Sequence, residues 1–234
     1  MRERPADQLR PVRLHLGYTD MTPGSVLIEM GRTRVLCTAS IEPDVPRWMR
    51  DSGKGWVTAE YGMLPGSSSE RIGRDQYQRG RALEISRLIG RALRSIVDLK
   101  AMGECMVRVD CDVIQADGGT RTAAISGAWV ALWYALEDGI VRGVLTRNPI
   151  VDHVAAISVG MVDGQVLLDL DYEDDVRADV DMNVVMSGRG LLVEVQGTAE
   201  QSPFSRQDLD QMLDLASRGI SELIAVQRQA TETT

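Results

Sequence analysis

The sequence predicts an α+β fold, because short strands arranged as hairpins are followed by helices, and this order occurs twice along the chain. In both halves, glycine turns separate runs of β-branched and apolar residues, and longer amphipathic runs come after them. The 234 residues are 44% apolar and 26% charged, with a net charge of −8, which is typical of a globular chain and excludes disordered and collagen-like classes. We expect one compact unit over residues 1–234, with a first half at 9–142 and a second half at 155–227.

The first half opens with a predicted hairpin. Residues 26–30 and 34–39 are short apolar runs on either side of Gly31-Arg32. Residues 81–97 then repeat apolar side chains at intervals of three and four, with arginines on the opposite side, so they predict an amphipathic helix with a basic face.

The second half is predicted to contain two further hairpins. Residues 156–162 and 166–170 flank Asp163-Gly164, a dipeptide that suits a type I′ turn. Residues 184–186 and 191–195 form the next pair.

A long helix is predicted to close the chain. Ser205 is followed three residues later by Asp208, which resembles a capping box at the start of an amphipathic run. The polar residues 227–234 are expected to fray.

Composition also narrows the function classes. The sequence has no run of 18 apolar residues, the length needed to span a membrane, and its first residues lack the apolar segment of a secretory signal. We therefore expect a cytoplasmic protein that does not contact a membrane. The three cysteines form no CxxC pair and only two histidines accompany them, which argues against structural zinc. No catalytic triad of serine or cysteine with histidine is visible.

The charge is distributed unevenly. Residues 70–94 hold seven arginines, three acidic residues and no lysine, a local charge of +4 that suits forked recognition of phosphate. Residues 163–181 hold eight acidic residues and one arginine, a local charge of −7 that a cation site would need. A solvated helix face and a charged sheet edge are the alternative interpretations of these two segments.

A glycine turn between a strand and a helix predicts an anion site. Residues 106–114 alternate as a strand, and a helix runs from Thr120 to about residue 137. Gly118 and Gly119 lie between them and allow backbone N–H groups to approach an anion at the helix N-terminus, where unpaired donors and the helix dipole favour negative charge.

Two arginines accompany this turn. Arg121 lies in the first turn of the helix, and Arg81 lies at the start of the basic helix, so the two helix starts could hold one phosphate from two sides. A tight turn with Thr120 as the capping residue is the alternative.

The acidic segment allows two pairings. Asp175 and Asp181 would be about 20 Å apart in an extended strand, so they can share an ion only if residues 176–178 turn the chain back. Asp179 and Asp181 would lie on one strand face about 6.6 Å apart, and the spacing leaves both pairs open. Because all the donors are oxygen atoms, Mg²⁺ or Mn²⁺ is the expected metal.

Together these segments resemble the bacterial RNase PH family, the phosphorolytic tRNA 3′-nucleotidyltransferases. The resemblance covers residues 9–227 and rests on the order and spacing of six segments. These are GSVL at 24–27, GWVTAEYGMLP at 55–65, EISRLIGRALR at 84–94, DCDVIQADGGTRT at 110–122, DMNVVM at 181–186 and EVQGT at 194–198. The resemblance implies the RNase PH fold, a two-layer unit like domain 2 of ribosomal protein S5, assembled as a homohexameric ring that is a trimer of dimers.

The resemblance also implies roles for individual residues. It assigns phosphate binding to Arg81, Gly119, Thr120 and Arg121. It favours Asp175 with Asp181 as the catalytic, metal-associated pair, which requires the turn at 176–178. The loop at 65–80 looks like the part that contacts tRNA, through Arg71, Arg74 and Arg79.

The implied activity is phosphate-dependent 3′-to-5′ exoribonuclease action on tRNA precursors and other RNA 3′ ends, including rRNA. Inorganic phosphate would attack the 3′-terminal phosphodiester and release a nucleoside diphosphate, and the reverse reaction would extend the 3′ end. Phosphate is itself the nucleophile, so no activated serine or cysteine is needed. A metal-dependent hydrolytic nuclease and a catalytically silent, RNA-binding ring subunit are the alternatives.

Overall fold

A five-stranded sheet carries the first half of the chain in the computed structural model, which describes residues 2, 4–73 and 80–232. The strands lie in the order β1 (Val12–Leu16), β2 (Gly24–Met30), β3 (Thr33–Glu42), β5 (Met106–Gln115) and β4 (Trp56–Met63). A short 3₁₀ helix, η1 (Arg47–Met49), precedes β4. Only β4 and β5 pair in parallel, and helix α1 (Gly80–Arg94) lies in the crossover that such pairing requires.

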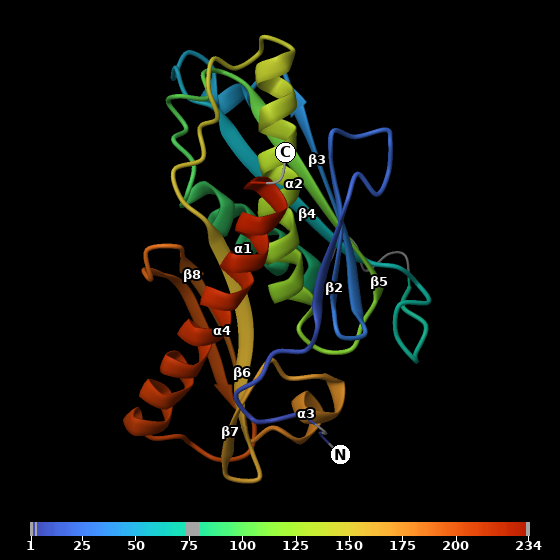
Figure 1. The fold of residues 1–234 in the computed structure, drawn as a ribbon, viewed down its shortest axis with the longest axis vertical. Helices are drawn as coiled ribbons and strands as arrows, with labels where there is room; N and C mark the ends of the chain where they lie inside the picture. The colour runs from blue at the N-terminus through green and yellow to red at the C-terminus, as the bar shows by residue number, and fades with distance from the viewer. Residues whose placement is uncertain (1, 3, 74–79, 233–234) are drawn as a thin grey trace.

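An antiparallel four-stranded sheet carries the second half. Its order is β7 (Gln165–Leu168), β6 (Val154–Val162), β8 (Val180–Ser187) and β9 (Leu192–Ala199). The short helix α3 (Tyr172–Arg177) connects β7 to β8, and α4 (Arg206–Glu232) follows β9 and packs on this sheet (Figure 1). No helix in the described ranges is both long and apolar enough to cross a membrane.

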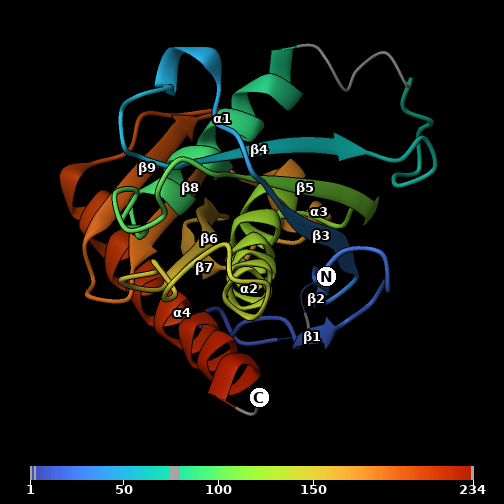
Figure 2. The ribbon, with the colours of Figure 1, turned by 90° about the horizontal axis from the view of Figure 1, so that it is seen from above.

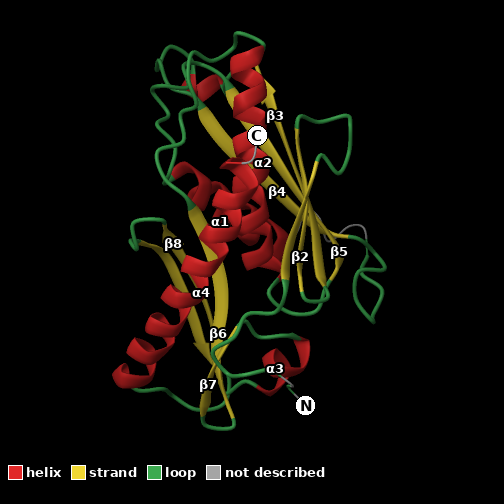
Figure 3. Cartoon of the chain, in the orientation of Figure 1, coloured by secondary structure: helices red, strands yellow, loops and turns green. Residues whose placement is uncertain are grey.

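Helix α2 (Thr120–Val141) lies at the centre, with the first sheet curving around one side and the second sheet on the other (Figure 2). A helix that is apolar on all sides is suited to this position. Small side chains allow α2 to approach the first sheet closely. At Gly127, a Cβ atom would lie only 2.7 Å from Cγ2 of Ile28 on β2. Helices α1, α2 and α4 lie between and beside the two sheets (Figure 3). Helix α2 contacts strands of both sheets.

Most predicted elements are present, and the α+β class is confirmed. Asp163 and Gly164 have φ values of 51° and 76°, as a type I′ turn requires. The capping box is formed, because the Ser205 N–H donates to Asp208 Oδ2 at 2.8 Å and the Asp208 N–H donates to Ser205 Oγ at 3.1 Å.

Four expectations about the elements need correction. The tail does not fray at residue 227: α4 continues to Glu232, because the Gln227 amide is buried and donates to the carbonyls of Ser126 and Val154, both at 3.0 Å. The strand predicted at 184–186 begins already at Val180, and the basic helix ends at Arg94, before residue 97. Strands β1 and β4 and helix α3 were not predicted as elements.

Candidate active site

The predicted phosphate-binding and acidic residues line one cavity of about 550 Å³. They come from four elements: Arg81 from the first turn of α1, Thr120 and Arg121 from the first turn of α2, Asp175 from α3 and Asp181 from β8. Gly119, the residue before α2, also lines the cavity. The fold therefore brings together residues that are up to 100 positions apart in the sequence.

The three arginines predicted to contact RNA are placed differently. Arg71 is exposed and does not line this cavity. Arg74 and Arg79 lie outside the described residues, so their role stays a prediction.

The glycine loop has the geometry of an anion site. Gly118 and Gly119 have φ values of 76° and 64°, in the left-handed region that favours glycine. A Cβ atom on Gly118 would lie 2.5 Å from the carbonyl oxygen of Leu170, so the loop also packs tightly against the second half. No described group accepts a hydrogen bond from the backbone N–H groups of Gly119, Thr120 or Arg121, which leaves these donors available to a ligand.

Residues that sequence reasoning missed hold this loop in place. Arg10 forms a buried ion pair with Asp169, with Nη2 2.6 Å from Oδ1, and also donates to the carbonyls of Asp117 and Gly118. The Thr33 hydroxyl donates to the Gly118 carbonyl at 2.6 Å and accepts from the Asp117 N–H at 3.0 Å. No short-range pattern could have found these contacts, because Arg10 and Asp169 are separated by 159 positions.

Part of the acidic segment is therefore neutralised within the chain. Asp169 pairs with Arg10, Asp174 pairs with Arg2 at 2.7 Å, and Asp163 pairs with Arg177. Of the acidic residues in this segment, Glu173, Asp175 and Asp181 line the cavity, and the family resemblance favours the two aspartates as the cation ligands.

Asparagine at position 169 is expected to destabilise the fold strongly. Removing one charge of a buried pair leaves the other uncompensated, which costs about 3–5 kcal/mol in the free energy of unfolding. Asp169 has a φ of 57°, and asparagine tolerates this conformation, so the backbone itself should not be strained. Urea unfolding of Asp169→Asn measures the loss.

Asp163→Asn is the matched control. Asp163 also has a positive φ, 51°, but its ion pair with Arg177 is exposed, and such pairs contribute within about 1 kcal/mol. Equal losses of stability in the two variants would contradict the role of the Arg10–Asp169 pair.

Two of the arginines that line the cavity, Arg81 and Arg121, are held in different ways. Arg121 Nη1 donates to Gln196 Oε1 at 2.8 Å and lies 3.5 Å from Glu84 Oε1, while Gln196 Nε2 donates to the same carboxylate oxygen at 3.1 Å. Its remaining guanidinium donors have no hydrogen-bond partner among the described residues. Arg81 likewise has no ion pair with a described residue. Both guanidinium groups can therefore donate to an anion in the cavity.

The two aspartates form a closely coupled acidic pair. Burial, together with the nearby Asp175 charge, raises the pKa of Asp181 to about 6, against the opposing effect of Arg121. Asp175 is exposed, and partial desolvation of its side chain raises its pKa while Arg81 opposes the rise. Neither side chain accepts a hydrogen bond from a described residue.

Helix α3 brings this pair together. It ends at Arg177, with Ala178 as its C-cap, so the chain turns where the Asp175–Asp181 pairing requires. Asp179, the alternative partner, does not line the cavity. Its backbone instead bonds to Met161 and Glu200.

The chemistry of this pair suits a hard cation. Two partly desolvated carboxylates that lack hydrogen-bond donors in the described structure gain from a cation between them. No group of three or more acidic, histidine or cysteine side chains that could hold a metal ion occurs in the described ranges, so the protein would supply two ligands. Mg²⁺ is ordinarily bound in this way, by one or two carboxylates with water and substrate phosphates completing its coordination.

Further polar residues of the cavity had weak or no sequence signals. Asn183 lies two residues after Asp181 on the same face of β8, and it faces Ser158 across the pair of strands β6 and β8. Asn183 belongs to the DMNVVM segment, whereas no pattern marked Ser158.

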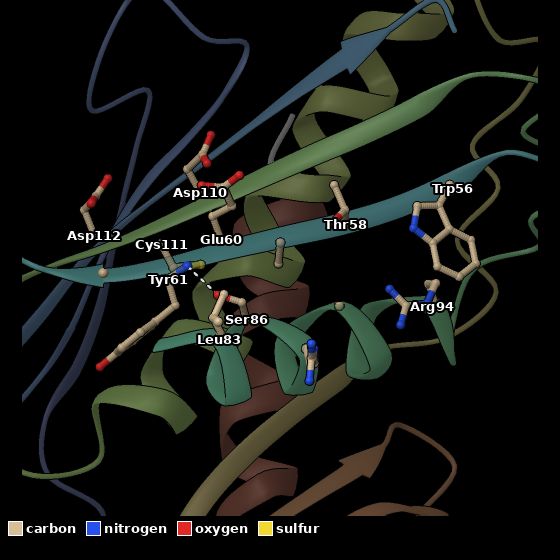
Figure 4. Close-up of a pocket in the computed structure, with 14 residues that line it drawn as sticks. Trp56, Thr58, Glu60, Tyr61, Leu83, Ser86, Arg94, Asp110, Cys111 and Asp112 are labelled. Carbon is tan, nitrogen blue, oxygen red and sulfur yellow. Dashed lines mark hydrogen bonds between the residues drawn. The ribbon is translucent and has the colours of Figure 1, made fainter. Parts of the chain in front are cut away.

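A larger hollow of about 740 Å³ follows the edge strand β4 and helix α1. Figure 4 shows Glu60, Asp110 and Asp112 on one side of it, and Arg94 beside Trp56 on the other. Burial and the neighbouring Glu60 raise the pKa values of Asp110 and Asp112. None of the predicted phosphate or acidic site residues lines it, so its size does not make it the active site.

Comparison with known proteins identifies the family of the chain. Residues 8–135 match the 3′ exoribonuclease family, domain 1, and residues 152–219 match domain 2 of the same family. Ribonuclease PH of Corynebacterium kroppenstedtii is 55% identical over 97% of this chain and 91% of the relative. Ribonuclease PH of Corynebacterium efficiens is 55% identical over 97% of this chain and 94% of the relative.

Solved structures confirm the predicted RNase PH fold. A chain of the Archaeoglobus fulgidus exosome with RNA bound to the active site has a TM-score of 0.81, with 20% identity, 95% of this chain covered and 90% of that one. Rice Rrp46 has a TM-score of 0.77, with 20% identity and 99% of both chains covered. At these identities the likeness concerns the fold alone.

Proposed function

The chain belongs to the 3′ exoribonuclease family, and from this membership we propose that its cavity binds inorganic phosphate beside the 3′-terminal phosphodiester of an RNA. The protein is a phosphate-dependent 3′-to-5′ exoribonuclease. One observation carries the assignment of the site: Arg81, Arg121 and the amides after Gly118 line the same cavity as Asp175 and Asp181. Donors for an anion thus lie in the same cavity as a pair of proposed cation ligands.

In the proposed reaction an oxygen of inorganic phosphate attacks the phosphorus of the last phosphodiester. The bond from that phosphorus to the 3′ oxygen of the preceding nucleotide breaks, the 3′ oxygen takes up a proton, and the terminal nucleotide leaves as a nucleoside diphosphate. Arg81 and Arg121 orient the nucleophile and reduce the repulsion between the two anions. The reverse reaction adds a nucleotide to the 3′ end.

Asp175 and Asp181 are the proposed ligands of Mg²⁺ or Mn²⁺. When bound there, the ion would stabilise negative charge on the reacting phosphoryl group. One of the two aspartates is proposed to handle the proton of the reaction, and the raised pKa of Asp181, about 6, suits it to that role near neutral pH.

The rate is expected to fall as pH is lowered through about 6. A protonated Asp181 no longer attracts a cation, and its pKa is raised to about 6, so the active ionised form is lost in this range. The measurement is kcat at saturating phosphate and limiting Mg²⁺, which separates this effect from the titration of phosphate itself. Raising the Mg²⁺ concentration should move the midpoint to lower pH, because cation and proton compete for the carboxylates; a midpoint that Mg²⁺ does not move would argue against Asp181 as a ligand.

tRNA precursors are the proposed substrate, with rRNA and other RNA 3′ ends as further ones. Arg71, Arg74 and Arg79 are proposed to contact the RNA backbone, so affinity should fall as salt is raised. We assign the active form to a cytoplasmic homohexamer, a trimer of dimers, in which basic segments of several subunits can act on one RNA despite a net charge of −8 per chain.

The released nucleotide tests this function. Incubation with tRNA carrying extra 3′ nucleotides should yield nucleoside diphosphates, and only when inorganic phosphate is added. Nucleoside monophosphates formed without phosphate would support a hydrolytic nuclease instead. RNA binding without any release of nucleotides would support a catalytically silent subunit.

A further inference from the structure

Tyr61 contacts both helices that contribute to the phosphate site, α1 and α2. It belongs to the segment GWVTAEYGMLP, to which the mechanism above gives no role. It lies on β4 with 4% of its surface exposed, and its hydroxyl oxygen is 2.8 Å from Oγ1 of Thr120. Thr120 opens α2 and lines the cavity with Arg81 and Arg121.

The backbone of Tyr61 is tied to α1. Its N–H donates to the Ser86 hydroxyl at 3.0 Å (Figure 4), and that hydroxyl donates to the carbonyl of Ala82 at 2.7 Å. Ser86 lies five residues after Arg81, in the second turn of α1, so one residue of β4 contacts both helices that supply the arginines.

The direction of the hydrogen bond between the two hydroxyls follows from their surroundings. Burial raises the pKa of Tyr61, so the phenol keeps its proton at neutral pH. Thr120 Oγ1 is the only hydrogen-bond partner of the phenol oxygen within the described ranges, and a buried O–H without an acceptor is costly. The phenol therefore donates to Thr120, whose own proton is left for an acceptor in the cavity.

We propose that Tyr61 is a positioning residue of the phosphate site: by donating to Thr120 it orients the Thr120 hydroxyl as a donor to bound phosphate. The inference rests on the proposed function, because it assumes that phosphate occupies the cavity. It predicts that Tyr61 acts through Thr120 on phosphate affinity and not on the chemical step.

The first test is Tyr61→Phe, which removes only the hydroxyl. The KM for phosphate should rise about fivefold to tenfold, the range that one hydrogen bond accounts for, while kcat at saturating phosphate stays within about twofold. Calorimetric titration of the protein with inorganic phosphate should show the same loss of affinity. An unchanged phosphate affinity in this variant would overturn the inference.

Tyr134→Phe is the matched control. It removes a tyrosine hydroxyl that donates to the carbonyl of Ala230 at 2.6 Å, at a position on α2 that does not line the cavity. Its KM for phosphate should match the wild type. If both variants raise the KM equally, general loosening of the fold explains the effect and the proposal fails.

A double-mutant cycle tests the route through Thr120. In a Thr120→Val background, Tyr61→Phe should have no further effect on phosphate affinity, whereas in Thr120→Ser, which keeps a hydroxyl, the full effect should persist. Additive effects in the valine background would overturn the proposal. Failure of the wild-type protein to bind phosphate in the titration would instead refute the proposed function.

Discussion

Asp181→Asn is expected to lower the kcat of phosphorolysis by about 10²–10⁴-fold, the range that a single acid–base or charge-stabilising group supplies. The substitution keeps the size of the side chain but removes the charge that would hold a cation opposite Arg121. The KM for phosphate should change little, because the arginines and the glycine loop remain. Steady-state kinetics with varied phosphate measures both constants.

The same variant should be more stable than the wild type at pH 7.5 when Mg²⁺ is absent. The pKa of Asp181 is raised from 3.8 to about 6, so above pH 6 the folded protein holds a charge that the unfolded chain solvates better. The stabilisation by asparagine should disappear near pH 4, where the aspartate is protonated in the folded state. Thermal unfolding at the two pH values therefore separates loss of activity from loss of structure.

Asp179→Asn is the control for this pair. Asp179 lies two residues earlier but does not line the cavity, so its variant should keep nearly full activity. A loss as large as that of Asp181→Asn would mean that the acidic pair is assigned wrongly.

Several helices and hairpins of the fold were predictable because their signals are local, whereas β1, β4 and α3 were not predicted. The Asp163-Gly164 turn and the Ser205 capping box depend on residues within a few positions of each other, and both are formed. The end of α4 was not predictable in this way. Gln227 is polar and suggested fraying, but its hydrogen-bond acceptors, the carbonyls of Ser126 and Val154, belong to distant elements.

In the candidate site too, some features have local sequence signals and others do not. The strand, glycine turn and helix around Gly119 were identified from local sequence, whereas the pairing of Asp175 with Asp181 came from the family resemblance. Spacing alone leaves both Asp175 and Asp179 open as partners of Asp181, because the six-residue helix α3 has no apolar periodicity from which a turn at residues 176–178 could be predicted. One local signal did exist: Asp171 caps α3 by accepting from the Asp174 N–H at 3.0 Å, in the arrangement typical of helix starts.

The supports of the site depend on tertiary contacts that connect both halves. Arg10 pairs with Asp169 and donates to the carbonyls of Asp117 and Gly118 in the glycine loop, and Gln196 on β9 holds Arg121 on α2. No single contact of this kind has a sequence pattern. The candidate phosphate-binding residues can be predicted from sequence more readily than the residues that position them.

Arg121→Ala is expected to raise the KM for phosphate about 10–100-fold and to lower kcat less. A charge-assisted hydrogen bond contributes about 1.5–3 kcal/mol, and the guanidinium of Arg121 has donors to spare beyond the one bound by Gln196. Arg121→Lys should restore only part of the affinity, because an ammonium group keeps the charge but cannot bind Gln196 and phosphate with one planar fork. Kinetics at varied phosphate, with RNA held at saturation, measures the effect.

Arg91→Ala separates this local role from general electrostatics. Arg91 lies on α1 and forms a two-pronged ion pair with Glu194, with Nη2 2.6 Å from Oε2, and it does not line the cavity. Arg91→Ala removes one positive charge, as Arg121→Ala does. If donors in the cavity bind the anion, the KM of Arg91→Ala for phosphate should stay within about twofold of the wild-type value. Equal increases in Arg91→Ala and Arg121→Ala would show that the net charge of the surface, and not the geometry of the cavity, attracts phosphate.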